Sequence, residues 1–290
     1  MKRTLLGIEI GGTKLQVVVG NSAGQILERH RFAINPTAGG AGIRQQLKAT
    51  LPFLVKTNKP RAIGVGFGGP VDWKTGKICC SHQIKGWSNF PLRTWLENLT
   101  DTLVAIDNDA NVAALGEATH GAGVGFNPVF YVTLGSGVGG GLVEAGKIYH
   151  GAKPGESEIG HVRLDKSGRI LESSCSGWAV DAKVQAAGLG DHAKYLKAAL
   201  AQKNPKAQKI LHDTTQDLAF GLSHVTHLFH PEMIILGGGL SLLGEPLRKA
   251  VAMALQEFIM DAFTPGPKIK LAKLGEDAVP VGGLKLALSA

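Results

Sequence analysis

Cysteine is scarce in this chain, and aromatic and charged residues are few. Its 290 residues include 3 cysteines, 6% aromatic residues and 19% charged residues. Cys79, Cys80 and Cys175 cannot make a disulfide framework, which fits a reducing compartment, so we expect a cytoplasmic protein. The sequence contains no apolar run of about 18 residues and no signal-peptide pattern, so we predict no membrane-spanning segment and no membrane partner.

Glycine, by contrast, is abundant, and the net charge is positive. The chain has 40 glycines and a net charge of +8. A glycine share of about twice the usual 7% marks places where backbone approaches closely or takes positive φ. The densest basic stretch, residues 194–209, is expected to be the solvated face of helices, with an anion-attracting patch as the alternative. No nucleic-acid-binding signature precedes the first strand, so no nucleic acid partner is expected.

Strands alternate with helices along the chain, which is typical of an α/β fold. Apolar runs and alternation predict strands at residues 4–10, 14–20, 25–33, 62–67, 103–106, 129–134, 141–144, 232–236 and 268–271. Helical periodicity predicts helices at 40–57, directly after 109, and at 176–187, 193–202, 213–229, 243–262 and 278–288.

A hairpin with a glycine-rich turn occurs twice, at Ile8–Val19 and at Tyr131–Val143. This layout indicates two related α/β lobes with a cleft between them. We expect the boundary near residue 110, with an N-terminal lobe of residues 1–110 and a C-terminal lobe of residues 111–277. The last helix, within residues 278–290, is expected to pack back on the N-terminal lobe.

Three glycine-rich turns carry the strongest chemical signal. They are Gly11-Gly12-Thr13-Lys14, the run that begins Gly135-Ser136-Gly137, and Gly237-Gly238-Gly239. Backbone without side chains brings N–H groups onto a phosphate, and a nearby hydroxyl adds a donor. None of the turns matches a P-loop, and the second lies between two strands, which disfavours a Rossmann site. Each turn alone favours a tight hairpin, whereas all three together favour a split nucleotide site.

Several segments resemble, in order, the motifs of the ROK family of repressors and sugar kinases. They are GIEIGGTKLQVVVGNSAGQIL, GVGFGGPVDWKTGKI, IDNDANVAALGEATHGAG, YVTLGSGVGGGLVEAGKIYHG, ESEIGHV, LESSCSGWAV and HPEMIILGGGL, spread over residues 5–288. The resemblance implies an actin/hexokinase-like (ribonuclease H-like) fold of two lobes. It also implies a glucokinase-like enzyme that phosphorylates a hydroxyl of a hexose or N-acetylhexosamine with ATP and Mg²⁺, and that forms a homodimer.

The resemblance also implies roles for single residues. Asp109 matches the general base. The positions that match sugar contacts are Gly69, Asn108, Glu158, His161 and Glu172. The positions that match the nucleotide loops are Gly11, Gly12, Thr13, Lys14, Gly135, Ser136, Gly137, Gly238 and Gly239. A carboxylate that ends a buried strand and opens a helix is rigidly placed for proton acceptance, whereas the alternative for Asp109 is a helix N-cap, a role that Asp107 and Asn108 also suit.

The chain departs from the family pattern at three points. The thiolate cluster that holds zinc in many members is absent, since only Cys175 follows His161, so we predict no zinc and a short loop at 164–170. Glu9 stands where the family has Asp, so Mg²⁺ is expected to be held there through a water. Gln83 stands where an Asn that contacts the sugar is expected, and the acceptor sugar therefore stays open.

Two other functions remain open. One is a non-catalytic, sugar-responsive regulator. The other is a sugar kinase that uses polyphosphate, an alternative suggested by the basic stretch 194–209 and the net charge of +8. The spacing of His224, His227 and His230 permits a metal site, but a helix end is the simpler interpretation. Trp87 and Trp178 are expected to pack in the protein rather than to stack on a ligand.

Overall fold

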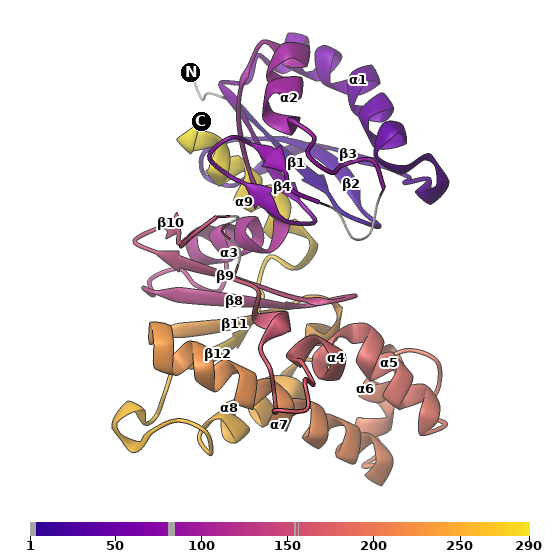
Figure 1. Ribbon diagram of the computed structural model, residues 1–290, viewed down its shortest axis with the longest axis vertical. Coiled ribbons are helices and arrows are strands. Elements are labelled where there is room, and N and C mark those ends of the chain that lie inside the picture. The colour runs from indigo at the N-terminus through magenta and orange to yellow at the C-terminus, as the bar shows by residue number, and fades with distance from the viewer. Residues whose placement is uncertain (1–3, 81–84, 154, 156) are drawn as a thin grey trace. The chain divides into compact units, whose positions relative to one another are not determined.

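The computed structural model describes residues 4–80, 85–153, 155 and 157–290 (Figure 1). The chain divides into two compact units. Unit 1 comprises Met1–Val124, Gly141–Glu156 and Glu276–Ala290, and unit 2 comprises Gly125–Gly140 and Ser157–Gly275. No helix in the described ranges is long and apolar enough to cross a membrane.

Unit 1 is built on a five-stranded sheet with the order β3-β2-β1-β4-β7. These strands are β1 (Leu5–Ile10), β2 (Leu15–Gly20), β3 (Ile26–Phe32), β4 (Ala62–Phe67) and β7 (Leu103–Asn108). The first three are antiparallel neighbours, whereas β1, β4 and β7 run parallel. Ile10 pairs with Phe67, and Phe67 pairs with Asn108. The turns that follow these three strands therefore leave the sheet at the same edge.

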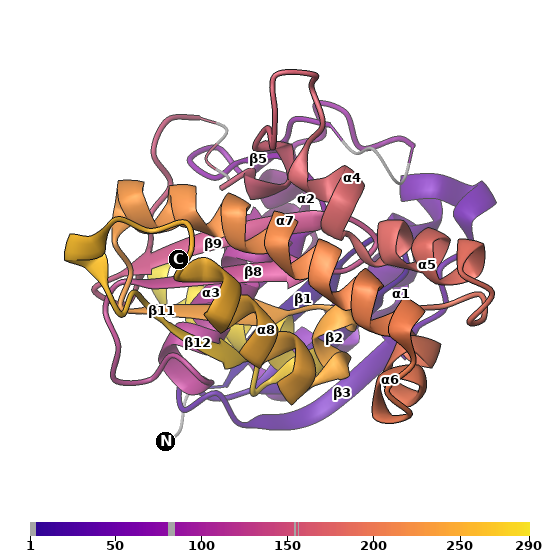
Figure 2. The same ribbon diagram turned by 90° about the horizontal axis from the view of Figure 1, so that it is seen from below.

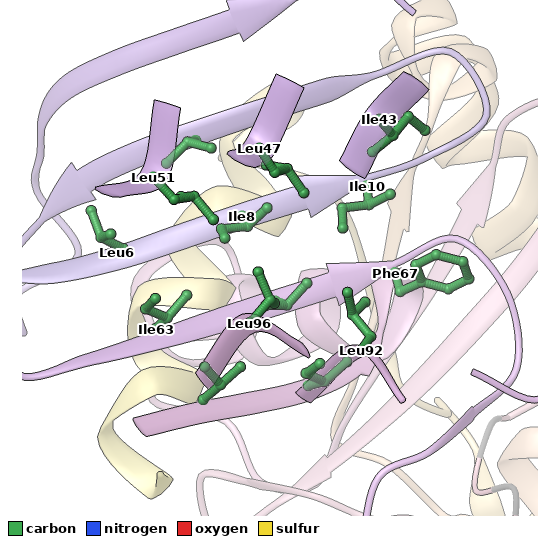
Figure 3. Close-up of a cluster of buried hydrophobic side chains, with 14 of the residues drawn as sticks. Leu6, Ile8, Ile10, Ile43, Leu47, Leu51, Ile63, Phe67, Leu92 and Leu96 are labelled. Atoms are coloured by element: carbon green, nitrogen blue, oxygen red, sulfur yellow. The ribbon is translucent and has the colours of Figure 1, made fainter. Parts of the chain in front are cut away.

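Helices cover both faces of this sheet. They are α1 (Gly39–Asn58), α2 (Leu92–Thr100), α3 (Asp109–His120) and α9 (Ala278–Leu286). The 3₁₀ turns in this part of the fold are η1 (Pro36–Ala38), η5 (Gly275–Asp277) and η6 (Ala287–Ser289). Its short strands are β5 (Val71–Asp72), β6 (Lys77–Ile78) and β10 (Lys147–Ile148). Side chains of α1 and α2 form one buried cluster with side chains of β1 and β4 (Figure 3). The predicted helix 40–57 is confirmed, and its apolar residues Ile43, Leu47, Leu51 and Leu54 are buried.

The other face of the sheet packs against α9 and α3 through glycines. A methyl group added to Gly64 would overlap the carbonyl oxygen of Gly283, and one added to Gly282 would overlap that of Val112. A methyl group on Gly7 would lie 2.7 Å from the carbonyl oxygen of Pro280. Backbones touch here without side chains between them, so the C-terminal helix lies against β1 and β4.

Unit 2 contains most of the second sheet, which has the order β10-β9-β8-β11-β12. Its longer strands are β8 (Val129–Leu134), β9 (Val138–Glu144), β11 (Met233–Gly237) and β12 (Lys268–Leu271), and the division between the units falls within β9. The helices are α4 (Leu171–Cys175), α5 (Gly177–Ala186), α6 (Lys194–Ala201), α7 (Pro205–Phe229) and α8 (Glu245–Leu255), with η2 (Ile159–His161), η3 (Gly239–Leu243) and η4 (Asp261–Phe263). Figure 2 shows α7 and α8 side by side, as their contacts require.

The α/β class is confirmed, and most predicted elements are present. The helix predicted at 213–229 begins earlier, because Asn204 caps it by accepting hydrogen bonds from Lys206 N and Ala207 N and Pro205 fills its first turn. The helix predicted at 243–262 ends at Leu255. The division into units differs from the expected boundary near residue 110, because α3 packs against α9 and so falls in unit 1.

Gly64→Ala tests the backbone contact between β4 and α9. The added methyl group overlaps Gly283, so we expect a loss of at least about 1–3 kcal/mol in the free energy of unfolding. Gly283→Ala is the comparison, because its methyl group would lie 3.1 Å from Gly64 O and should cost less. Urea denaturation measures both variants, and a Gly64→Ala protein as stable as the wild type would contradict this packing.

Candidate functional site

The first glycine-rich turn lies at the sheet edge where β1 and β4 end. Gly11 N donates a hydrogen bond to Lys14 O at 2.8 Å, which closes the turn between β1 and β2. Gly68 N donates to Ile10 O at 2.8 Å. A methyl group on Gly68 would lie 3.3 Å from both Gly11 Cα and Asp109 Oδ2. Glycine at 68 therefore leaves room for the Asp109 carboxylate to lie beside the first glycine turn.

Asp109 is the first residue of α3, but it is not the helix cap. Asn108 is the N-cap, and its Oδ1 accepts hydrogen bonds from Ala110 N at 2.8 Å and Asn111 N at 3.3 Å. The cap interpretation considered for Asp109 thus belongs to its neighbour. Asn108 Nδ2 donates to Gly69 O at 3.3 Å, so two residues predicted to contact sugar lie together in unit 1.

Glu9 is a buried acid near the end of β1. It is 8% exposed, and its Oε2 accepts a hydrogen bond from Gln16 Nε2 at 2.5 Å. Burial raises the pKa of its carboxyl group above the usual value, since the charged form loses its hydration. A buried carboxylate that lacks full compensation is a suitable oxygen ligand for a hard cation. Mg²⁺ commonly takes one or two carboxylates, several waters and substrate phosphates, so Glu9 fits a magnesium ligand.

The second glycine-rich turn is supported by α4 and α5 of unit 2. Gly135 N donates to Gly137 O at 2.9 Å, and Gly177 N donates to Gly135 O at 2.7 Å. Glu172 Oε2 accepts a hydrogen bond from Val138 N at 2.8 Å, and a side chain at Gly137 would overlap this carboxylate. One oxygen of Glu172, a predicted sugar ligand, therefore holds the turn itself.

The third glycine-rich turn meets the second. Gly238 has a φ of 77°, and a methyl group there would lie 2.5 Å from the backbone N of Leu134, the residue before Gly135. The second and third glycine-rich turns thus come together within unit 2. Trp178, the second residue of α5, is 68% exposed, so the packing predicted for it is wrong. Trp87 is fully buried, as predicted.

Glu158 and His161, both predicted sugar contacts, also lie together. Glu158 Oε2 is 3.5 Å from His161 Nδ1, and both side chains are more than half exposed. A methyl group on Gly140 would lie 3.0 Å from Ser157 O, so glycine in β9 lets this turn approach the strand. The pair presents a carboxylate and an imidazole to solvent, a set that suits vicinal hydroxyls. Gln83 lies outside the described residues.

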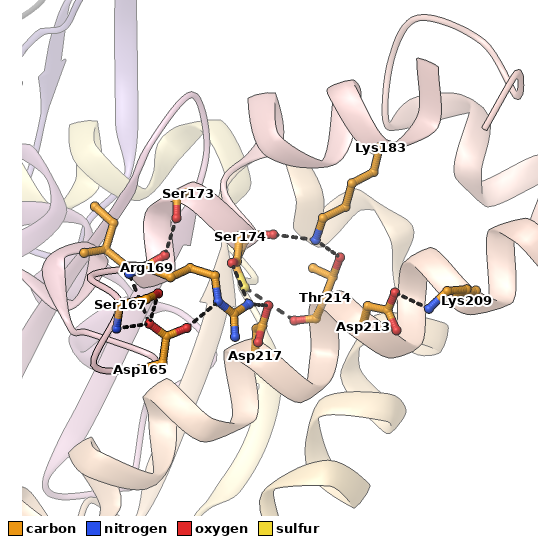
Figure 4. Close-up of polar contacts among 12 residues, drawn as sticks. Asp165, Ser167, Arg169, Ser173, Ser174, Lys183, Lys209, Asp213, Thr214 and Asp217 are labelled. Atoms are coloured by element: carbon orange, nitrogen blue, oxygen red, sulfur yellow. Dashed lines mark hydrogen bonds and ion pairs between the residues drawn. The ribbon is translucent and has the colours of Figure 1, made fainter. Parts of the chain in front are cut away.

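Ion pairs close the loop at 164–170, where the thiolate cluster is absent (Figure 4). Leu164 N donates to Arg169 O at 2.8 Å. Arg169 pairs with Asp165 at 3.0 Å and with Asp217 of α7 at 2.7 Å. Hydrogen bonds from Ser167 and Arg169 lower the pKa of Asp165 to about 2, so its carboxylate stays charged at neutral pH. Asp165 and Arg169 thus connect this short loop to α7.

The remaining candidate metal ligands have other partners. Burial raises the pKa of the Cys175 thiol to about 12, and its Sγ donates to Thr214 O at 3.4 Å, so it is a poor zinc ligand. His227 Nε2 accepts a hydrogen bond from Met260 N, and His230 ends α7 and stacks on a phenylalanine. Among the residues the structure describes, no group of three or more His, Cys, Asp or Glu side chains is arranged to hold a metal.

Comparison with known proteins decides the family. The model of the ROK family matches residues 5–290. This chain belongs to the ROK family. A glucokinase of Halalkalibacterium halodurans is 30% identical over 97% of this chain and 94% of its own length. The ROK hexokinase structure from Thermus thermophilus has a TM-score of 0.85 at 27% identity, covering 99% of this chain and 98% of its own.

A structure of a ROK glucokinase from Streptomyces griseus, in complex with glucose and AMPPNP, has a TM-score of 0.84. It is 28% identical, and the match covers 99% of this ROK chain and 100% of that one. The actin/hexokinase-like fold expected from the sequence is confirmed by these structural neighbours.

Glu9→Gln tests the buried carboxylate. The pKa of Glu9 is raised above its usual value of 4.5, so the folded protein favours the protonated carboxyl group. This contribution to stability is fully present below pH 4.5 and is lost as the pH rises through the raised pKa. We therefore expect the variant to melt a few degrees above the wild type at about pH 8 and level with it at about pH 4. Calorimetry at both pH values measures this, and a lower melting temperature at the higher pH would contradict the assignment.

Metal analysis tests the zinc-free loop. With the thiol of Cys175 protonated and Arg169 paired to two carboxylates, we expect well under about one zinc per chain after purification. We also expect the melting temperature to be unchanged by EDTA. Stoichiometric zinc that is lost together with stability on chelation would contradict the prediction.

Proposed function

We propose that this protein is an ATP-dependent sugar kinase that phosphorylates a hydroxyl of a hexose or N-acetylhexosamine, with Asp109 as general base. The observation that carries the proposal is the position of Asp109 Oδ2, beside Gly68 and the first glycine turn at Gly11. The glucokinase and hexokinase relatives support the reaction class.

Asp109 has the chemistry that the transfer needs. Phosphoryl transfer passes through a loose transition state in which the attacking hydroxyl loses its proton late. A carboxylate, although a weak base, is therefore a sufficient acceptor. Asn108 rather than Asp109 caps α3. General-base catalysis by a positioned carboxylate contributes about 10²–10⁴-fold in rate.

The glycine turns provide the nucleotide contacts in this proposal. Backbone N–H groups of Gly11–Thr13 and Gly135–Gly137 would donate to phosphate oxygens, with the Thr13 and Ser136 hydroxyls as further donors. Lys14 adds positive charge, and Gly238–Gly239 would border the adenosine. Glu9 would hold Mg²⁺ through water, and the cation would neutralise charge on the phosphates.

The sugar contacts in this proposal are Gly69, Asn108, Glu158, His161 and the second oxygen of Glu172. Carboxylates accept hydrogen bonds from two hydroxyls, and imidazole offers one donor and one acceptor. None of these contacts distinguishes glucose from mannose or an N-acetylhexosamine. We also propose a cytoplasmic homodimer, which light scattering on the purified protein tests directly.

We propose ATP rather than polyphosphate as the donor, because three lysines of the basic stretch 194–209 already have partners within the protein. Lys197 Nζ donates to Leu242 O at 3.2 Å, and Lys206 Nζ donates to Ala187 O at 3.0 Å. Lys209 pairs with an aspartate of its own helix at 2.8 Å. These side chains form local contacts on helices rather than one patch directed at a polyanion.

Asp109→Asn tests the base. We expect kcat for sugar phosphorylation to fall by about 10²–10⁴-fold, because the amide cannot accept the proton, while the sugar Kd changes little. Sugar phosphate formation is measured over glucose, mannose, fructose, N-acetylglucosamine and N-acetylmannosamine, with ATP or polyphosphate as donor.

Asp213→Asn, at an exposed ion pair of α7, is the control and should keep wild-type turnover. A variant that keeps more than about a tenth of kcat rejects the base, and sugar binding without any turnover by the wild type indicates the regulator.

A further inference from the structure

A hydrogen-bonded pair, Asp107 and His150, lies next to the proposed base and has no part in the chemistry above. Asp107 precedes the Asn108 cap in β7 and is 3% exposed. Its Oδ2 accepts a hydrogen bond from His150 Nε2 at 2.5 Å, and its Oδ1 accepts one from Asn108 N at 2.8 Å. Both oxygens of this carboxylate are therefore engaged, which fixes its orientation.

The same carboxylate joins the start of α3 to a distant segment of unit 1. Asn111 Nδ2 donates to Asp107 Oδ1 at 2.9 Å and to Gly155 O at 3.0 Å. Asp107 thus contacts the backbone before Asp109 and a side chain of the first turn after it. Movement of this carboxylate would change the direction in which α3 begins.

His150 is itself held in place by Trp73. Its ring stacks on Trp73, with centroids 4.0 Å apart and planes inclined by 12°. Arg93 of α2 holds Trp73 by donating to its carbonyl oxygen at 2.7 Å. The imidazole is only 17% exposed. A mostly buried ring, fixed by a stacking partner and by a hydrogen bond to Asp107, is suited to orienting that carboxylate.

We propose that Asp107 and His150 form a positioning pair, in which the His150 N–H holds Asp107 and thereby aims the Asp109 carboxylate at the sugar hydroxyl. The inference rests on the proposed sugar kinase activity. Displacement of a reacting group by about 1 Å can cost on the order of 10²-fold in rate. Asp107 accepts a hydrogen bond from the backbone of Asn108 but is not itself a proposed sugar contact, so loss of the pair lowers kcat far more than it weakens sugar binding.

A cavity gives experimental access to the pair. Trp73, Asp107 and His150 line a cavity of about 1110 Å³ within unit 1. His150→Ala therefore leaves a ring-sized space that a small solute can reach. Imidazole fills that space and supplies an N–H donor to Asp107. Neutral 1-methylimidazole also fills it and stacks on Trp73, but it has no N–H to donate.

The test is turnover of His150→Ala with and without these two solutes. At about pH 9 free imidazole rings are neutral, since their ordinary pKa is about 6.5. We expect kcat to fall at least about tenfold, with a much smaller change in the sugar Kd. Imidazole should restore most of the lost kcat, and 1-methylimidazole should restore little. The Asp107→Asn/His150→Ala double variant should show no rescue by imidazole. His192→Ala, which removes an exposed histidine 3.6 Å from Asp181, is the matched control and should keep wild-type kcat.

The outcomes separate a donor from a space-filling ring. Unchanged kcat in His150→Ala, equal rescue by both solutes, or rescue by neither would overturn the proposal. If His150→Ala does not fold, His150→Gln keeps a donor and should exceed His150→Phe in kcat at equal melting temperature, and equal kcat would overturn the proposal. A wild-type protein that phosphorylates no sugar rejects the proposed function together with this inference, whereas an active wild type with an unaffected variant rejects the inference alone.

Discussion

The structure of unit 1 depends on one constraint, namely that three parallel strands end at the same edge with backbone in direct contact. Gly68 N bonds to Ile10 O, and the absence of a side chain at 68 leaves room for the Asp109 carboxylate. A larger residue at Gly68 would have to displace either the glycine turn or the carboxylate. The glycine-rich composition of the chain is thus a requirement of the site as well as of its packing.

Unit 2 uses the same device for its turns. Gly177 donates to Gly135 O, and Gly137 lies against the Glu172 carboxylate without a side chain between them. A side chain at Gly177 would lie against the carbonyl oxygen of Gly135, and a side chain at Gly137 would displace the Glu172 carboxylate. Asp165 and Arg169 hold the neighbouring loop at 164–170 against α7.

Most helices and strands could be predicted from the sequence, because strand alternation and helical periodicity are local signals. The spacing of Ile43, Leu47 and Leu51 predicts α1, and the motifs bring the family resemblance. Helix α2 was missed although Leu92 and Leu96 carry a helical spacing, since it has only 9 residues and begins after a proline. Its pattern was too short to distinguish from a loop.

Long-range contacts could not be predicted, because no local pattern encodes them. Asp107 and His150 are 43 residues apart, and no periodicity pairs them. The exposure of Trp178 depends on how α5 packs, which the sequence around it does not reveal. The early start of α7 could have been predicted, because an Asn followed by a Pro is a common helix start and Asn204 and Pro205 begin this helix.

The central claim is that Asp109 faces the sugar hydroxyl that receives the phosphate. The most direct measurement is a crystal structure of the protein with its preferred sugar and a non-hydrolysable ATP analogue. The account predicts an Asp109 carboxylate oxygen within about 2.6–3.2 Å of one hydroxyl, with that hydroxyl directed at the terminal phosphate. A carboxylate turned away from both ligands, with another group bonded to that hydroxyl, would contradict it.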